Sequence, residues 1–131
     1  RTMFPQTGFS REDRDQHIRR IGYLAGMLER HGVCVIASFI SPYRDSREHV
    51  RNATKNFIEV FVSTPLEECE KRDPKGLYKK VREGHLKQFT GIDDPYEKPE
   101  NSEITINTAG KSISECVAKV INYLKKEKYI L

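Results

Sequence analysis

The sequence predicts an α/β domain with a parallel sheet. Three apolar runs rich in β-branched residues fit strands that are covered on both faces: Val33–Ala37, Phe57–Val62 and Ile104–Asn107. Stretches with the apolar spacing of helices separate these runs, and alternating helices and strands are typical of layered α/β folds. Three strands make a narrow sheet for this class, so we expect further strands upstream of Arg1.

Composition narrows the range of functions. The chain has 131 residues, which suits one domain with its own core. Its 23 Lys and Arg exceed its 19 Asp and Glu, a net charge of +4 that favours an anionic ligand. A basic stripe interleaved with aromatics, a membrane-length apolar stretch and a targeting signal are all missing from the sequence, so we expect no nucleic acid and no membrane as partners. Cys34 and Cys116 fit reduced core positions, which favours a cytoplasmic location.

The first expected helix follows Phe9, with Ser10 as its N-cap and Asp13 in its first turn. Gly32 fits the left-handed position that ends such a helix. The apolar stripe of this helix comprises Ile18, Ile21, Leu24, Ala25 and Leu28.

Three further helices are expected. Residues 45–55 form a short charged helix with Val50 and Ala53 on its inner side. Thr64 is expected to cap a helix that starts at Pro65 and runs to about Arg72. The last helix opens with a capping box, Ser112 with Glu115. Its apolar face and its basic C-terminal end comprise Val117, Val120, Ile121, Leu124, Lys125, Lys126 and Lys128.

Polar residues follow the first expected strand abruptly: Ser38, Ser41, Tyr43 and Arg44. The carboxyl ends of parallel strands are where open sheets bind ligands, so these side chains indicate a polar ligand site. The alternative is a plain strand that leads into a helix capped by Ser41 or Asp45.

Residues 73–99 lack core periodicity and are broken by glycines. A long basic segment of this kind inside a compact domain is more often functional than idle. We interpret it as a lid over an anionic ligand; the alternative is a disordered basic loop. Its lysines are Lys75, Lys79, Lys80 and Lys87.

The sequence contains no histidine, serine and cysteine arrangement typical of hydrolases, no carboxylate cluster for a metal ion, and no G-x-x-x-x-G-K-[ST] loop. From the residues alone, the chain is an α/β domain that binds a small anion under a lid.

Several runs closely resemble the adenylylsulfate kinase family and follow the family's order from about Arg1 to Leu124. They are Gly8–Ser10, Asp13–Arg14, Ile18–Arg20, Ser38–Arg44, Phe57–Val62, Arg72–Lys80, Phe89–Ile92 and Pro95–Glu97. The resemblance implies a P-loop kinase-like three-layer fold, of which residues 1–131 are the C-terminal part, with the P-loop and some strands upstream. It also implies transfer of a phosphoryl group from MgATP to the 3'-hydroxyl of adenosine 5'-phosphosulfate, which gives 3'-phosphoadenosine 5'-phosphosulfate.

The resemblance assigns roles to individual residues. The acceptor's adenine is expected between Phe9 and Phe89, and its other contacts are expected from Arg1, Arg14, Ile40, Ser41 and Lys87. Ser41 also matches a serine described in some members as a phosphorylated intermediate. Arg72 matches an arginine near the ATP base, Lys79 and Lys80 belong to the lid, and no residue is implied as a metal ligand. The chain departs from the family at His17, where an asparagine is usual.

The family also suggests a dimer, and some members are fused to ATP sulfurylase. Because the P-loop is not among these residues, we expect activity only together with an upstream P-loop segment. The alternative is a degenerate, non-catalytic nucleotide-binding or regulatory domain. Another small-molecule P-loop kinase is disfavoured by the lid residues Phe89–Ile92.

Overall fold

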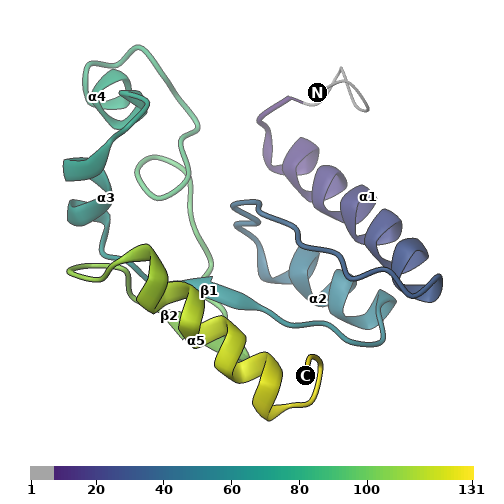
Figure 1. Cartoon of the computed structure of the whole chain (residues 1–131). Coiled ribbons are helices and arrows are strands. Elements are labelled where there is room, and N and C mark those ends of the chain that lie inside the picture. Colours follow the sequence, from purple (N-terminus) through teal and green to yellow (C-terminus); the bar gives the residue numbers. More distant parts are fainter. Residues whose placement is uncertain (1–7) are drawn as a thin grey trace. The chain divides into compact units, whose positions relative to one another are not determined.

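The computed structural model describes residues 8–131, which form two compact units (Figure 1). The first unit contains residues 8–57 and 88–98, and the second contains residues 58–87 and 99–131. Helices α1 (Arg11–Arg30) and α2 (Arg44–Ala53) belong to the first unit. The second unit contains β1 (Val60–Val62), α3 (Leu66–Arg72), α4 (Leu77–Arg82), β2 (Ile104–Ile106) and α5 (Ile113–Lys126).

Helix α1 begins and ends where local signals predict. The Ser10 hydroxyl accepts the Asp13 N–H at 3.1 Å, and the Asp13 carboxylate accepts the Ser10 N–H at 3.2 Å. This capping box satisfies two backbone donors at the helix start. Its hydrogen bonds, led by that from the Ser10 hydroxyl, lower the pKa of Asp13. Gly32 has a φ of 78°, so the left-handed conformation after the helix is confirmed.

Helices α1 and α2 pack closely because α1 presents two buried glycines. A Cβ added at Gly22 would lie 2.5 Å from a Val50 methyl carbon, and one added at Gly26 would lie 3.1 Å from the Ala53 carbonyl oxygen. Val50 is half-buried against α1, as expected, whereas Ala53 is exposed and only its carbonyl oxygen approaches α1.

The start of α2 differs from the prediction. Its N-cap residue is Tyr43, which makes no side-chain cap, so neither Ser41 nor Asp45 caps this helix. Instead the Glu97 carboxylate accepts the Arg44 N–H at 2.7 Å. The cap is thus supplied by a distant part of the chain.

The expected strand over Val33–Ala37 is wrong: these residues form no strand. They are exposed, Ile36 by as much as 93%. A strand needs a neighbour for its ladder, and among residues 8–131 the only sheet joins β1 to β2. For the same reason Cys34 is exposed rather than a core residue.

The second unit contains the parallel sheet that the sequence predicts. Strands β1 and β2 are parallel, with Val60 opposite Ile104 and Val62 opposite Ile106. Ile104 and Ile106 are buried, and α5 packs against β2. Strand β1 is shorter than the apolar run over Phe57–Val62, since only its last three residues pair. An α/β arrangement with a parallel sheet is confirmed.

The predicted helices α3 and α5 are present, with one correction at the start of α3. Helix α5 has the expected capping box, in which the Ser112 hydroxyl accepts the Glu115 N–H at 3.2 Å. Thr64 does not cap α3, whose N-cap residue is Pro65. The Thr64 hydroxyl instead accepts the Thr108 N–H at 3.1 Å. A contact across the fold has replaced the local cap.

Candidate functional site

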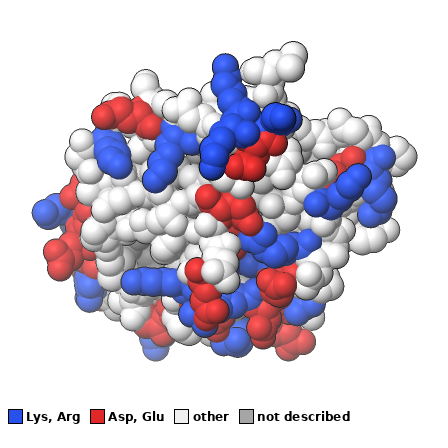
Figure 2. Space-filling model, turned by 90° about the horizontal axis from the view of Figure 1, so that it is seen from below, with Lys and Arg blue, Asp and Glu red and all other residues white. Residues whose placement is uncertain are grey.

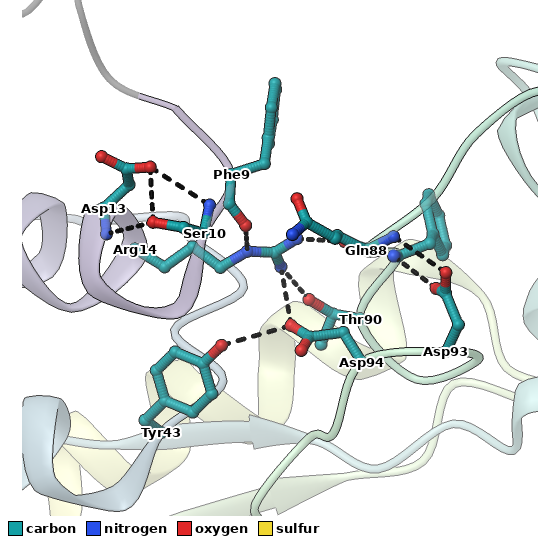
Figure 3. Close-up of polar contacts among 10 residues, drawn as sticks. Phe9, Ser10, Asp13, Arg14, Tyr43, Gln88, Thr90, Asp93 and Asp94 are labelled. Carbon is teal, nitrogen blue, oxygen red and sulfur yellow. Dashed lines mark hydrogen bonds and ion pairs between the residues drawn. The ribbon is translucent and has the colours of Figure 1, made fainter.

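Arg14, in the first turns of α1, is the centre of a polar network in the first unit (Figure 3). Its Nε donates to the Phe9 carbonyl at 2.8 Å. Its other guanidinium nitrogens donate to the Thr90 hydroxyl and to the Gln88 carbonyl, and one lies 3.6 Å from the Asp94 carboxylate. The Arg14 side chain is only 14% exposed. Arg14 therefore connects the start of α1 to residues 88–94.

Residues 88–94 form a compact turn held by the Asp93 carboxylate and by its own backbone. The Asp93 carboxylate accepts the N–H groups of Gln88 at 2.8 Å and of Phe89 at 2.5 Å. These hydrogen bonds, with that from Phe89 the largest contribution, lower the pKa of Asp93. The Phe89 carbonyl in turn accepts the N–H groups of residues 92–94. These hydrogen bonds hold the backbone of Phe89 in the turn.

A buried tyrosine adds a second connection to this turn. The Tyr43 hydroxyl donates to the Asp94 carboxylate at 3.2 Å. Burial, followed by the negative charge of Asp94, raises the pKa of Tyr43, so the phenol keeps the proton it donates. The Arg11 guanidinium lies 4.4 Å from the centroid of the Tyr43 ring, within the range of a cation–π contact.

Four of the residues assigned to the acceptor belong to the first unit besides Arg14. Phe9 is 59% exposed, and its ring extends away from the polar network in Figure 3. Phe89 is half-buried, and Ile40 is exposed. Ser41 has a φ of 44°, and its carbonyl accepts a hydrogen bond from Arg47 at 2.7 Å. Arg1 lies outside the described residues.

The other assigned residues belong to the second unit. Lys79 and Lys80 lie in α4, and they and Lys87 are exposed. Arg72 bonds to Glu68 at 3.0 Å and to the Thr108 hydroxyl at 2.8 Å. The segment 73–99, expected to be a lid, is divided between the units after Lys87.

Sequence reasoning missed Arg47 and Glu97. Arg47 is 8% exposed, although it lies in a charged helix that reads as solvated. Glu97 belongs to the run Pro95–Glu97, which the family resemblance included without a role. Both residues bond to backbone groups, and such partners leave no signature in a sequence.

The surface carries charged side chains of both signs. Positive and negative side chains are interspersed on the face drawn in Figure 2. Among the described residues no group of three or more His, Cys, Asp or Glu could hold a metal ion. No helix in this part of the chain is both long and apolar enough to span a membrane.

Known proteins share this sequence and fold. The family model for adenylylsulphate kinase matches residues 1–107. The chain is 57% identical to the adenylyl-sulfate kinase of Synechococcus sp. (strain JA-3-3Ab) over 125 residues, which are 95% of this chain and 71% of that protein. It is 51% identical to the adenylyl-sulfate kinase of Staphylococcus epidermidis over 125 residues, which are 94% and 63% of the two chains.

A solved structure extends the comparison to three dimensions. The APS kinase CysC of Mycobacterium tuberculosis, in complex with AMPPNP and APS, superposes with a TM-score of 0.88 at 40% identity. The match covers 94% of this chain and 73% of that one. From the family model, the sequence relatives and this structural match together, we conclude that the chain belongs to the adenylylsulphate kinase family.

Proposed function

We propose that this chain forms the acceptor-binding part of a kinase that phosphorylates the 3'-hydroxyl of adenosine 5'-phosphosulfate with MgATP. The observation that carries the proposal is the Arg14 network. It bonds the Phe9 carbonyl and the two neighbours of Phe89, so both phenylalanines of the expected adenine clamp belong to one hydrogen-bonded assembly. The mycobacterial relative, which was solved with APS and AMPPNP, supports the choice of substrates.

The two phenylalanines suit an adenine clamp for a physical reason. Stacking of a base on an aromatic ring contributes roughly 1–3 kcal/mol. The ring of Phe9 is largely exposed, and that of Phe89 is half-buried on a hydrogen-bonded turn. Arg14 and the Asp93 carboxylate hold the backbone from which the two rings extend.

Ser41 serves in this proposal to position the acceptor. A serine nucleophile needs a base within hydrogen-bond reach, and the Ser41 hydroxyl makes no hydrogen bond to any of residues 8–131; only its carbonyl is bonded. Phosphoryl transfer depends mainly on positioning and charge stabilisation. We therefore assign direct transfer from ATP to the acceptor.

ATP binding requires more than these residues supply. Backbone amides of a P-loop and its lysine cradle the phosphates in kinases of this fold, and Mg2+ offsets the phosphate charge. The 131 residues contain no such loop. Activity therefore belongs to the complete kinase, by which we mean this chain joined to a P-loop segment. Lys79, Lys80 and Lys87 are exposed and suit a basic lid that faces the phosphates.

Replacing Phe89 by alanine in the complete kinase tests the clamp. We expect acceptor binding, measured by calorimetry with adenosine 5'-phosphosulfate, to weaken roughly 10–100-fold, which is the loss of one stacked ring. Affinity for ATP should change little, because the proposed clamp holds only the acceptor. The melting temperature should change little, because the hydrogen bonds of the turn come from its backbone and the Asp93 carboxylate.

Phe57→Ala is the matched control, since Phe57 is a half-buried phenylalanine of the same unit that contacts Arg51 instead. It should leave acceptor affinity unchanged. A Phe89→Ala variant that melts earlier yet binds the acceptor normally would show that the ring is structural. Binding of both substrates without turnover by the parent would instead indicate a non-catalytic domain.

A further inference from the structure

We infer that Arg47 is a positioning residue for the proposed acceptor site, where it fixes residues 41–43, called the Ser41 loop below, relative to residues 88–98. This inference rests on the proposed function, because that function gives Ser41 and Phe89 their roles. Arg47 is not itself assigned a contact with the acceptor. It acts through the backbone carbonyls of two loops.

The geometry of Arg47 joins these loops directly. One terminal nitrogen donates to the Ser41 carbonyl at 2.7 Å, and the other donates to the Glu97 carbonyl at 2.6 Å. The guanidinium lies 5.8 Å from the centroid of the Tyr96 ring. A guanidinium is a rigid planar fork, so two bonds from its two ends fix the separation of the two carbonyls.

The Ser41 loop needs such an anchor. Ser41 has a φ of 44°, a backbone conformation that residues other than glycine rarely adopt. A residue of this kind persists where its surroundings hold it in place. Pro42 follows, and its carbonyl accepts the Glu97 N–H at 2.8 Å. Two consecutive carbonyls of the Ser41 loop are therefore hydrogen-bonded: that of Ser41 to Arg47, and that of Pro42 to the Glu97 N–H.

Arg14 and Arg47 hold opposite ends of the segment 88–98. Arg14, on α1, bonds to the start of this segment at Gln88 and Thr90. Arg47, on α2, bonds near its end at Glu97. Neither Ser41 nor Phe89 lies in a helix or strand. The two arginines therefore help to hold these residues in place, together with the Asp93 carboxylate at Phe89. Misplacing a bound reactant by about 1 Å is enough to slow a reaction roughly 100-fold.

Arg47→Lys in the complete kinase tests this role, because lysine keeps the charge and loses the fork. We expect kcat/KM for adenosine 5'-phosphosulfate to fall about 10-fold or more, with KM for ATP unchanged. Amide exchange should become faster at both Glu97 and Arg44, whose N–H groups bond across the same junction. Arg51→Lys is the matched control: it lies one turn further along α2 and its guanidinium contacts the Phe57 ring at 4.8 Å.

The outcomes separate this inference from the proposed function. A parent kinase without turnover of adenosine 5'-phosphosulfate refutes the proposed function, and the exchange measurement then decides alone whether Arg47 holds the two loops. An active parent whose Arg47→Lys variant matches Arg51→Lys in both kinetics and exchange refutes the inference. A lower melting temperature with an unchanged acceptor kcat/KM would also overturn it, since Arg47 would then be structural only.

Discussion

Replacing Gly22 by alanine tests how closely α1 and α2 must approach. The new Cβ would lie 2.5 Å from one Val50 methyl carbon, 3.1 Å from the other and 3.2 Å from the Val50 Cβ. Non-bonded carbon atoms prefer about 3.5–4.0 Å. Rotation of Val50 does not relieve the contact, because both methyl groups are already too close and a helical valine has one strongly preferred rotamer.

Two opposing effects set the expected magnitude. Overpacking a close contact costs about 1–3 kcal/mol, and the three short distances place this case in the upper half of that range. Alanine in the middle of a helix is about 1 kcal/mol more favourable than glycine. We therefore expect Gly22→Ala to lower the free energy of unfolding by about 1–2 kcal/mol.

Urea unfolding followed by circular dichroism measures this change. The double variant Gly22→Ala/Val50→Ala removes both methyl groups that the new Cβ would meet. In the Val50→Ala background the 2.5 and 3.1 Å contacts are gone and only the 3.2 Å contact to the Cβ of residue 50 remains. The helix preference also remains, so Gly22→Ala should cost clearly less stability there, or none. An equal loss of stability in both backgrounds would refute the packing argument, as would a stabilising Gly22→Ala single variant.

Two further predictions concern the proposed acceptor site. Ser41→Ala in the complete kinase should retain substantial turnover and mainly raise KM for adenosine 5'-phosphosulfate, because the hydroxyl has no base beside it; a complete loss of turnover with acceptor affinity unchanged would favour a serine intermediate. The pH response of the 88–94 turn depends on Asp93, whose pKa is lowered below 3.8 by the hydrogen bonds from Phe89 and Gln88. Because the pKa of Asp93 is lower in the folded state than in the unfolded state, its carboxylate stabilises the turn at any pH above the unfolded-state pKa. This stabilisation is lost as the pH falls through the folded-state pKa. Amide protection factors at Gln88 and Phe89 should therefore fall below about pH 4 and lose this dependence in Asp93→Asn; protection that is independent of pH in the parent would contradict the assignment.

Features set by neighbouring residues could be predicted from the sequence. Ser10 with Asp13 and Ser112 with Glu115 form their capping boxes, because both partners lie within one turn. Gly32 adopts the conformation that other residues avoid. The parallel pairing of the last two apolar runs also follows from their pattern. Each of these features needs little or no knowledge of the rest of the fold.

Features set by distant contacts could not be predicted. Val33–Ala37 has the composition of a buried strand. A strand forms only beside another strand, however, and the composition of one segment does not show whether a neighbouring strand is present. Thr64 has the chemistry of a cap, but its hydroxyl bonds to Thr108, 44 residues away. At the proposed acceptor site, the resemblance indicated Phe9, Arg14 and Phe89 as functional residues. It did not predict that Arg14 bonds to the backbone carbonyls of Phe9 and Gln88.

The carboxylate of Glu97 at the start of α2 has a consequence for the order of folding. Helix α2 has 10 residues, and isolated helices shorter than about 12–15 residues are marginal in water. Its first N–H is held by a side chain 53 positions later, and closing a loop of that length costs conformational entropy before any bond forms. Helix α1, capped by its own Ser10, has no such requirement. We expect α1 to form early and the first turn of α2 to form only when residues 88–98 dock, so the N-terminal end of α2 remains unformed until the polypeptide has grown past Glu97.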